Sequence, residues 1–283
     1  MLNNRRINAL SIDLEDWHHP QLLQGHLSLP NKSLIESSTG TLLSLLQKYN
    51  TKATFFILGE IALSNPELIK MIADQGHEIA CHGFYHHSLQ KSRPTKLRNE
   101  LIKFQEIITS ILGNTQIKGF RAPNFSLNQS TAWAINVLKE LNFKYDSSIF
   151  PVKMNPLYGV NGAPIAIYGL NSNNIKIPDC KSTLIEFPLT VFEILKLRFP
   201  ISGGFYLRLL PIKAQKIMLQ LINRRQPFII YLHPWECSKD TPRIKLDFVS
   251  SFIAYYNIKS CLGKLETLLK NFKFDRIDTI LGV

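Results

Sequence analysis

The first half of the sequence alternates short apolar segments with segments in which leucine and isoleucine recur at helical spacing. Residues 7–13 and 52–59 read as strands, and residues 33–48 and 66–76 read as helices. Further segments of the same two kinds follow at 77–83, 93–112, 118–124, 131–143 and 144–150. This β–α rhythm predicts a parallel sheet covered by helices, either open or closed into a barrel.

The second half is less regular. Residues 151–210 are rich in proline, glycine and asparagine, so we expect a loop-rich insertion of loops and hairpins near the mouth of the sheet. Regularity returns with a helix at 212–224, a buried parallel strand at 227–236 and a last helix at 258–272. Because no internal repeat or linker divides the chain, we predict a single domain over residues 1–283.

The net charge of +12 and the pI near 9.5 favour an anionic partner. The basic residues are dispersed, without a basic block, a zinc-finger spacing or an RNA-binding aromatic motif, so we expect a glycan or a peripheral contact with an anionic membrane surface and no nucleic acid. Four widely spaced cysteines are typical of reduced thiols. No hydrophobic segment precedes the first strand, so the expected location is cytoplasmic, peripheral to the inner membrane.

Polar residues gather where the expected strands end. The first strand runs into the carboxylates of Asp13, Glu15 and Asp16. Similar polar residues at the ends of later strands are His82, His86, Arg121, Asp146, His233 and Glu236. Ligand and catalytic groups of α/β folds collect at the carboxyl ends of parallel strands. We therefore expect these side chains to form one site.

The segment HGFYHH carries His82 and His86 at a four-residue spacing. On a helical turn two imidazoles so spaced face the same way and can bind one divalent ion. An acidic residue from the first strand would complete a set of two nitrogens and one oxygen. An isolated pair of this kind is usually structural, but the neighbouring acidic cluster favours a metal site.

The ordered motifs SIDLEDW, ATFFILGE, HEIACHGFYHH, GFRAPNFS, YDSSIFP and YLHPWE resemble the polysaccharide deacetylase family, the NodB-like carbohydrate esterases. The opening D-x-E-D-W and the R-A-P-x-F-S motif are most similar to the branch found beside exopolysaccharide gene clusters, which implies a part in exopolysaccharide biosynthesis. The resemblance covers about Ala9 to Glu236. It implies an α/β fold, a distorted (β/α) barrel of the NodB homology type with fewer than eight strands.

The resemblance also implies the metal site. His82 and His86 match the two metal-binding imidazoles, and the expected ion is divalent, with Zn²⁺ favoured over Co²⁺ or another ion. The third ligand of the family is an aspartate directly after the catalytic base, where this chain has Leu14. Either Glu15 or Asp16 must then replace it: strand alternation favours Glu15, and a bulge or turn after the strand favours Asp16.

The remaining site residues are implied in the same way. Asp13 matches the base that removes a proton from the attacking water, and Arg121 matches the arginine that orients this base. His233 matches the general acid, with Asp146 as the candidate partner that holds and charges it; Asp146 could equally bond its own turn. Asn124 falls where a backbone N–H would stabilise the oxyanion, and the two tryptophans beside the motifs, which could stack on a sugar or fill the barrel mouth, are Trp17 and Trp235.

Three functions remain open at this stage. The first is metal-dependent removal of an N-acetyl group from an amino sugar in a polysaccharide or in a lipid- or nucleotide-linked glycan precursor. The second keeps the fold and acts as a deformylase of a lipid-linked amino sugar or as a cyclic-amide hydrolase. The third is a catalytically inactive barrel that binds glycans. The presence of the base, both histidines, the arginine and the late histidine disfavours the third.

Overall fold

The computed structural model describes residues 6–24, 33–152 and 159–283. Within these residues the main sheet has nine strands. In sheet order they are β10 (Ile229–Leu232), β1 (Asn8–Leu14), β2 (Thr54–Ile57), β3 (Glu78–Cys81), β4 (Gly119–Phe120), β5 (Tyr145–Asp146), β7 (Ile185–Glu186) and β6 (Tyr168–Gly169), with β11 (Phe274–Asp275) also paired to β1. All pairings except β6 with β7 are parallel, as the β–α rhythm predicts.

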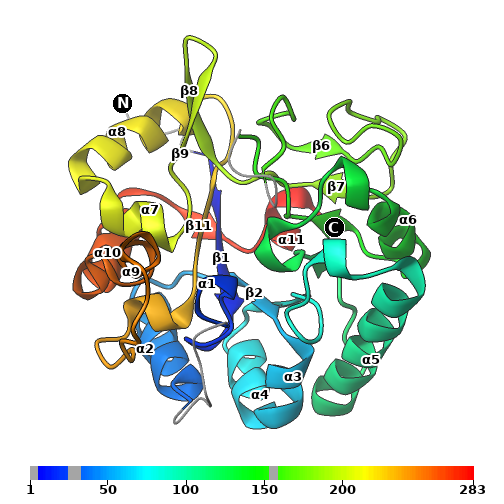
Figure 1. Cartoon of the computed structure of the whole chain (residues 1–283), viewed down its shortest axis with the longest axis horizontal. Coiled ribbons are helices and arrows are strands. Elements are labelled where there is room, and N and C mark those ends of the chain that lie inside the picture. Colours follow the sequence, from blue (N-terminus) through cyan, green and yellow to red (C-terminus); the bar gives the residue numbers. More distant parts are fainter. Residues whose placement is uncertain (1–5, 25–32, 153–158) are drawn as a thin grey trace.

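The helices lie mostly on the outer side of the sheet, except that α11 (Ile277–Leu281) lies within the ring (Figure 1) and packs with Ala9 and Phe56. The other helices are α1 (Gln21–Gln24), α2 (Ile35–Lys48), α3 (Gly59–Ser64), α4 (Pro66–Asp74), α5 (Pro94–Leu112), α6 (Trp133–Glu140), α7 (Gly204–Leu209), α8 (Ile212–Asn223), α9 (Phe248–Tyr255) and α10 (Cys261–Asn271). The short 3₁₀ turns are η1 (Leu89–Lys91), η2 (Pro123–Phe125), η3 (Gln129–Thr131), η4 (Pro234–Cys237) and η5 (Ile258–Ser260). No helix of the described residues is long and apolar enough to cross a bilayer.

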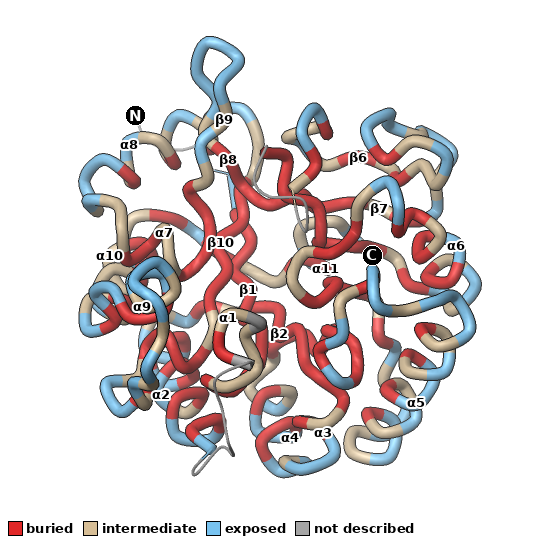
Figure 2. The backbone as a smooth tube through the Cα atoms, viewed as in Figure 1, coloured by how far each residue is buried: buried red, intermediate tan, exposed pale blue. Residues whose placement is uncertain are grey.

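The sheet is curled, and its end strands β10 and β6 do not pair with each other in the described part of the chain. The result is the expected distorted barrel, left open on one side. Its central strand β1 is buried along its whole length (Figure 2), including the polar residues Asn8, Ser11 and Asp13. The helices bury one stripe each against this layer, as α5 does with Leu97, Leu101 and Phe104.

Residues 151–210 are more ordered than their composition suggests. Residues 153–158 lie outside the described part, but the remainder supplies β6, β7 and α7 and a separate antiparallel hairpin, β8 (Val191–Ile194) and β9 (Leu197–Pro200). β7 extends the parallel sheet beside β5, so this region is part of the barrel as well as an insertion into it. The strand is only two residues long, too short to show a hydrophobic period.

Candidate active site

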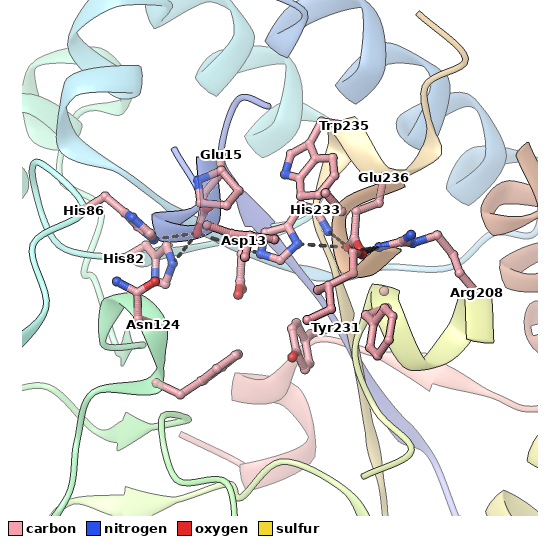
Figure 3. A pocket seen from close by; sticks show the side chains of 17 residues that line it. Asp13, Glu15, His82, His86, Asn124, Arg208, Tyr231, His233, Trp235 and Glu236 are labelled. Carbon is pink, nitrogen blue, oxygen red and sulfur yellow. Dashed lines mark hydrogen bonds and ion pairs between the residues drawn. The ribbon is translucent and has the colours of Figure 1, made fainter. Parts of the chain in front are cut away.

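The carboxyl ends of four parallel strands meet at one pocket of about 430 Å³ (Figure 3). Side chains that follow β1, β3, β4 and β10 converge there, as the sequence predicts. The pocket is lined by Asp13, Glu15, Pro20, Leu22, His82, His86, Asn124, Phe125, Gly204, Phe205, Arg208, Tyr231, His233, Trp235, Glu236, Ile253 and Ala254.

Glu15, His82 and His86 form a compact cluster in the pocket. One oxygen of Glu15, Oε1, lies 2.9 Å from Nε2 of His82 and 2.9 Å from Nε2 of His86, and the candidate ligand atoms of the three residues lie within 4.8 Å of one another. All three side chains are buried. Two imidazole nitrogens and one carboxylate oxygen are a donor set that zinc binds in catalytic sites. The residues present therefore fit a divalent ion.

The two histidines are positioned by the loop after β3. Nδ1 of His82 lies 2.8 Å from the carbonyl oxygen of Arg121. A carbonyl only accepts, so Nδ1 donates to it, and Nε2 is the ring nitrogen that faces Glu15. The expected helical turn is wrong: residues 82–88 are irregular, and His86 has a φ of 56°. The rings converge because the loop folds back on itself.

The charge of Glu15 is supported by its neighbours. Burial would raise the pKa of this carboxyl group, but His86 and His233 and the hydrogen bonds from the two ligand-type histidines hold it well below its usual value. Glu15 is therefore a carboxylate near neutral pH, the form that binds a cation.

Asp16, the other candidate ligand, is placed elsewhere. Its side chain accepts hydrogen bonds from the backbone N–H of Trp17 at 2.8 Å and of Leu34 at 3.2 Å. Leu34 is the residue before α2, so Asp16 ties the loop after β1 to the start of that helix. Of the two alternatives, the geometry therefore favours Glu15 as the third ligand, because the Asp16 carboxylate is occupied by these backbone groups.

Asp13 is buried beside the cluster and is held by Arg121. Nη1 of Arg121 donates to Oδ1 of Asp13 at 2.5 Å and to Oγ of Ser11 at 2.9 Å. The rest of the guanidinium donates to the carbonyl oxygen and the hydroxyl of Ser147, both at 2.8 Å. With every branch of the guanidinium occupied, Arg121 fixes the orientation of the Asp13 carboxylate.

His233 follows β10 on the opposite side of the pocket. Its Nδ1 lies 2.9 Å from Oε2 of Glu236, and its Nε2 lies 3.9 Å from Glu15. Burial opposes the charged form, but Glu15 and the bond to Glu236 raise the pKa of His233 to about 9. Glu236 is held in turn by Arg208 at 2.9 Å, which lowers the pKa of Glu236 to about 2 against the effect of burial.

The expected pairing of Asp146 with His233 is wrong, since Glu236 occupies that role. Asp146 accepts from the hydroxyl of Ser148 at 2.7 Å, and that hydroxyl accepts from the backbone N–H of Ala122 at 2.7 Å. Asp146 is also next to the buried carboxyl group of Glu186, and burial raises the pKa of both groups. The carboxylate therefore holds its own turn and the loop after β4, in line with the alternative reading of its sequence.

The sequence places Glu236 at the expected site without giving it a role, and it does not single out Arg208. Glu236 lies three residues after His233, within reach of it on the single turn η4, so the motif HPWE contained a usable signal. For Arg208 the signal was weak: the pair Gly203 and Gly204 at the start of α7. A Cβ on Gly204 would meet the Glu236 carboxylate at 1.8 Å, so only glycine lets α7 approach η4 closely enough for Arg208 to reach Glu236.

The residues expected to contact substrate divide into two groups. Asn124, with a φ of 56°, and Trp235, whose ring stacks on that of His233 at 5.7 Å, both line the pocket. Trp17 does not: it is packed in a buried cluster with Leu34 and Trp235, so its expected contact with substrate is wrong. Aromatic residues that the sequence did not single out, Phe125, Phe205 and Tyr231, line the pocket instead.

Fold and site together define an α/β barrel with a histidine–carboxylate cluster at the carboxyl ends of its strands. Residues 29–145 match the family model "Polysaccharide deacetylase", and residues 147–282 match "Domain of unknown function (DUF3473)". The first part of the chain is thus similar to the polysaccharide deacetylase family, and the second part is similar to DUF3473.

Curated relatives match parts of the chain. The chain is 41% identical over 75 residues to a peptidoglycan-N-acetylglucosamine deacetylase of Bacillus cereus, covering 26% of this chain and 27% of that protein. It is 32% identical over 117 residues to a peptidoglycan deacetylase of Helicobacter pylori, covering 41% and 39%. The chain thus spans well under half the length of these two curated relatives.

The fold is similar to that of solved structures along the whole chain. The structure of a putative polysaccharide deacetylase from Mycobacterium smegmatis has a TM-score of 0.62 at 18% identity and covers 100% of this chain and 91% of that one. A CE4 family pseudoenzyme from Bacillus anthracis has a TM-score of 0.51 at 15% identity, covering 98% and 66%. Because one fold serves both a deacetylase family and a pseudoenzyme, the side chains of the pocket must decide the function.

Proposed function

We propose that this protein is a metal-dependent hydrolase that removes the N-acetyl group from an amino sugar of a glycan. Relatives over parts of the chain are named as deacetylases of N-acetylated glycans, which supports this class of substrate. The observation that carries the proposal is that one oxygen of Glu15 faces Nε2 of both His82 and His86. The same pocket contains the Asp13 carboxylate, fixed by Arg121, and the His233 imidazole, fixed by Glu236. The proposed metal ligands are Glu15, His82 and His86.

Each proposed role follows from the geometry. A divalent ion held by the three ligands would polarise the acyl carbonyl and lower the pKa of the attacking water. Asp13, oriented by Arg121, accepts the proton of that water. His233, whose Nδ1 is held by the Glu236 carboxylate, donates a proton from its imidazolium form to the leaving nitrogen. Glu236 and Arg208 position His233 and maintain its charge.

The rest of the pocket supports binding of a sugar. Trp235, Phe125 and Tyr231 offer apolar faces of the kind that stack on sugar rings. Asn124 lies at the edge of the cluster, where a donor would meet the developing oxyanion. We propose that these residues bind the N-acetylated ring and that the glycan is a polysaccharide or a lipid- or nucleotide-linked precursor.

Release of free amine tests the proposal. Zinc-loaded protein is incubated with N-acetylglucosamine oligomers and with nucleotide- and lipid-linked N-acetyl sugars, and amine is measured with and without chelator. Amine that appears with metal, disappears with chelator and returns when metal is restored is the expected result. Metal binding with no amine from any of these substrates would instead favour a glycan-binding protein without activity.

A further inference from the structure

The β8–β9 hairpin projects from the barrel away from the pocket-lining helices α7 and α9 (Figure 1) and is exposed along most of its length (Figure 2). Ile194, Leu197 and Phe199 are between 48% and 62% exposed, and Leu195 at the tip is 90% exposed. Four apolar side chains gathered at the end of a projecting element are unusual for a surface that only meets water.

The pairing of the strands gives the hairpin one apolar face. Phe192 is opposite Phe199, and Ile194 is opposite Leu197, so these two cross-strand pairs lie on the same side. The intervening pair, Glu193 with Arg198, is joined by an ion pair of 2.7 Å on the other side. The hairpin is therefore amphipathic.

The turn at the tip has an unfavourable composition for its shape. Leu195 and Lys196 form a two-residue turn with φ values of 49° and 65°. A two-residue turn with both φ values positive favours Asn-Gly, because larger side chains are disfavoured in the left-handed region. The chain instead places its most exposed leucine and a lysine there. Strained positions of this kind are characteristic of functional sites.

The surroundings of the hairpin are strongly basic. Between residues 191 and 226 the chain has seven lysines and arginines and one acidic residue, Glu193. Glu193 pairs with Arg198, and Arg208 is buried in the pocket. The basic residues of this stretch that remain without an acidic counterpart in it are Lys196, Lys213, Lys216, Arg224 and Arg225.

Helix α8 carries part of this charge next to the hairpin. Lys213, Ile217, Leu221 and Arg224 share one face of the helix by their spacing, and all four are exposed. The end of this face borders the hairpin, since Leu221, Arg224 and Arg225 line a groove of about 290 Å³ together with residues 191–193 of β8. The hairpin and this face of α8 form one surface, which we call the hairpin surface.

We propose that the hairpin surface docks the protein on an anionic lipid bilayer, with the tip at Leu195 among the acyl chains and the basic residues among the headgroups. A few apolar side chains on a projecting tip suffice for interfacial binding when basic residues flank them. The charge and the shape thus favour a membrane over a globular partner.

Vesicle co-sedimentation tests this docking. The protein is mixed with vesicles of phosphatidylcholine alone and of phosphatidylcholine with phosphatidylglycerol, and the bound fraction is measured. We expect binding to the anionic vesicles that weakens with added salt. Replacing the tip by its preferred turn, Leu195→Asn with Lys196→Gly, removes the apolar tip and relieves the strain. This variant should keep or raise the Tm and bind at least about tenfold more weakly.

Two further variants test whether binding needs the basic residues and whether it is specific to the hairpin surface. Arg224→Gln with Arg225→Gln should weaken binding to anionic vesicles by roughly thirtyfold, at about tenfold per 1.4 kcal/mol and about 1 kcal/mol per charge. Phe248→Ser is the matched control, because Phe248 is 86% exposed on α9, outside the hairpin surface, and its loss should leave binding unchanged.

No binding of the wild type, or equal binding by the tip variant, would overturn the proposal. So would concentration-dependent dimers that the tip variant abolishes in the absence of vesicle binding, because the hairpin surface would then meet a second copy. Vesicle binding does not depend on the proposed hydrolase activity. His82→Ala should bind vesicles like the wild type, so failure of one proposal is distinguishable from failure of the other.

Discussion

The two sides of the pocket are assembled differently. On one side, Glu15 follows β1, and His82 and His86 follow β3. The carbonyl oxygen of Arg121 orients His82, and Glu15 contacts both histidines directly. On the other side His233 depends on Glu236, and Glu236 depends on Arg208 from α7, a helix that precedes β10 in the chain by about 20 residues. The difference teaches that one side is built by strand ends and the loops that follow them directly, whereas the other requires a helix to be brought against the sheet.

The residues on the two sides also control charge in opposite ways. Histidines lower the pKa of Glu15 on one side, and carboxylates raise the pKa of His233 on the other. We therefore propose a cation site next to a group that donates a proton. Changes on the first side should remove metal, and changes on the second should alter proton transfer while metal remains.

The largest effect is expected on the ligand side. Glu15→Gln removes the charge that faces both histidines, so metal affinity should fall by more than the roughly 10–100-fold typical of residues behind the ligands. Metal content after dialysis measures this, and amine release should fall with it. Asp16→Asn is the matched control one residue away: it should retain metal and lose about 1 kcal/mol of stability through the weakened link to α2. Equal metal content in both variants would contradict the assignment.

A smaller effect is expected on the proton-donor side. Glu236→Gln removes an anion that raises the pKa of His233, so this pKa should fall and the alkaline limb of kcat/KM should move to lower pH. Metal content should not change. Asp146→Asn, a carboxylate that does not contact His233, should leave the alkaline limb in place. The pH profile of amine release is measured for both variants. A shift of the alkaline limb in the Asp146 variant alone would show that Asp146, and not Glu236, is the partner of His233.

The smallest effect on the site is expected from a buried carboxyl group that lies away from both sides of the pocket. Glu78, at the start of β3, accepts from Tyr145 and Thr54, and burial raises its pKa to about 7. Its folded pKa lies above the unfolded value, so the stability it contributes is present below about pH 4.5 and is lost as pH rises toward about pH 7, by up to roughly 3 kcal/mol. The free energy of unfolding, measured in urea at both ends of this pH range, should show this loss. Glu78→Gln should make that free energy less dependent on pH without affecting metal content.

The sequence predicts the ligand side well because its residues belong to contiguous motifs at the ends of recognisable strands. His82 and His86 could be placed together even though the expected helical turn does not exist, since a loop brings the rings to the same point. The choice between Glu15 and Asp16 could not be made, because it depends on where the chain turns after β1. The proton-donor side was predicted only through His233. The contact of Arg208 with Glu236 joins residues 28 apart in the chain and depends on how α7 packs, which periodicity does not reveal.

The dependence of the rate on the leaving group tests the division of the pocket most directly. Metal-loaded wild type and His233→Ala are compared by kcat/KM on an N-acetyl amide and on an activated acetate ester of the same sugar. An amine leaves poorly unless it is protonated, whereas the activated alcohol departs without a proton, so loss of the imidazolium should slow the amide by about 10²-fold or more and the ester far less. Metal content should stay full in the variant. An equal loss on both substrates would show that His233 does not donate the proton, and the proposed division of the site would be wrong.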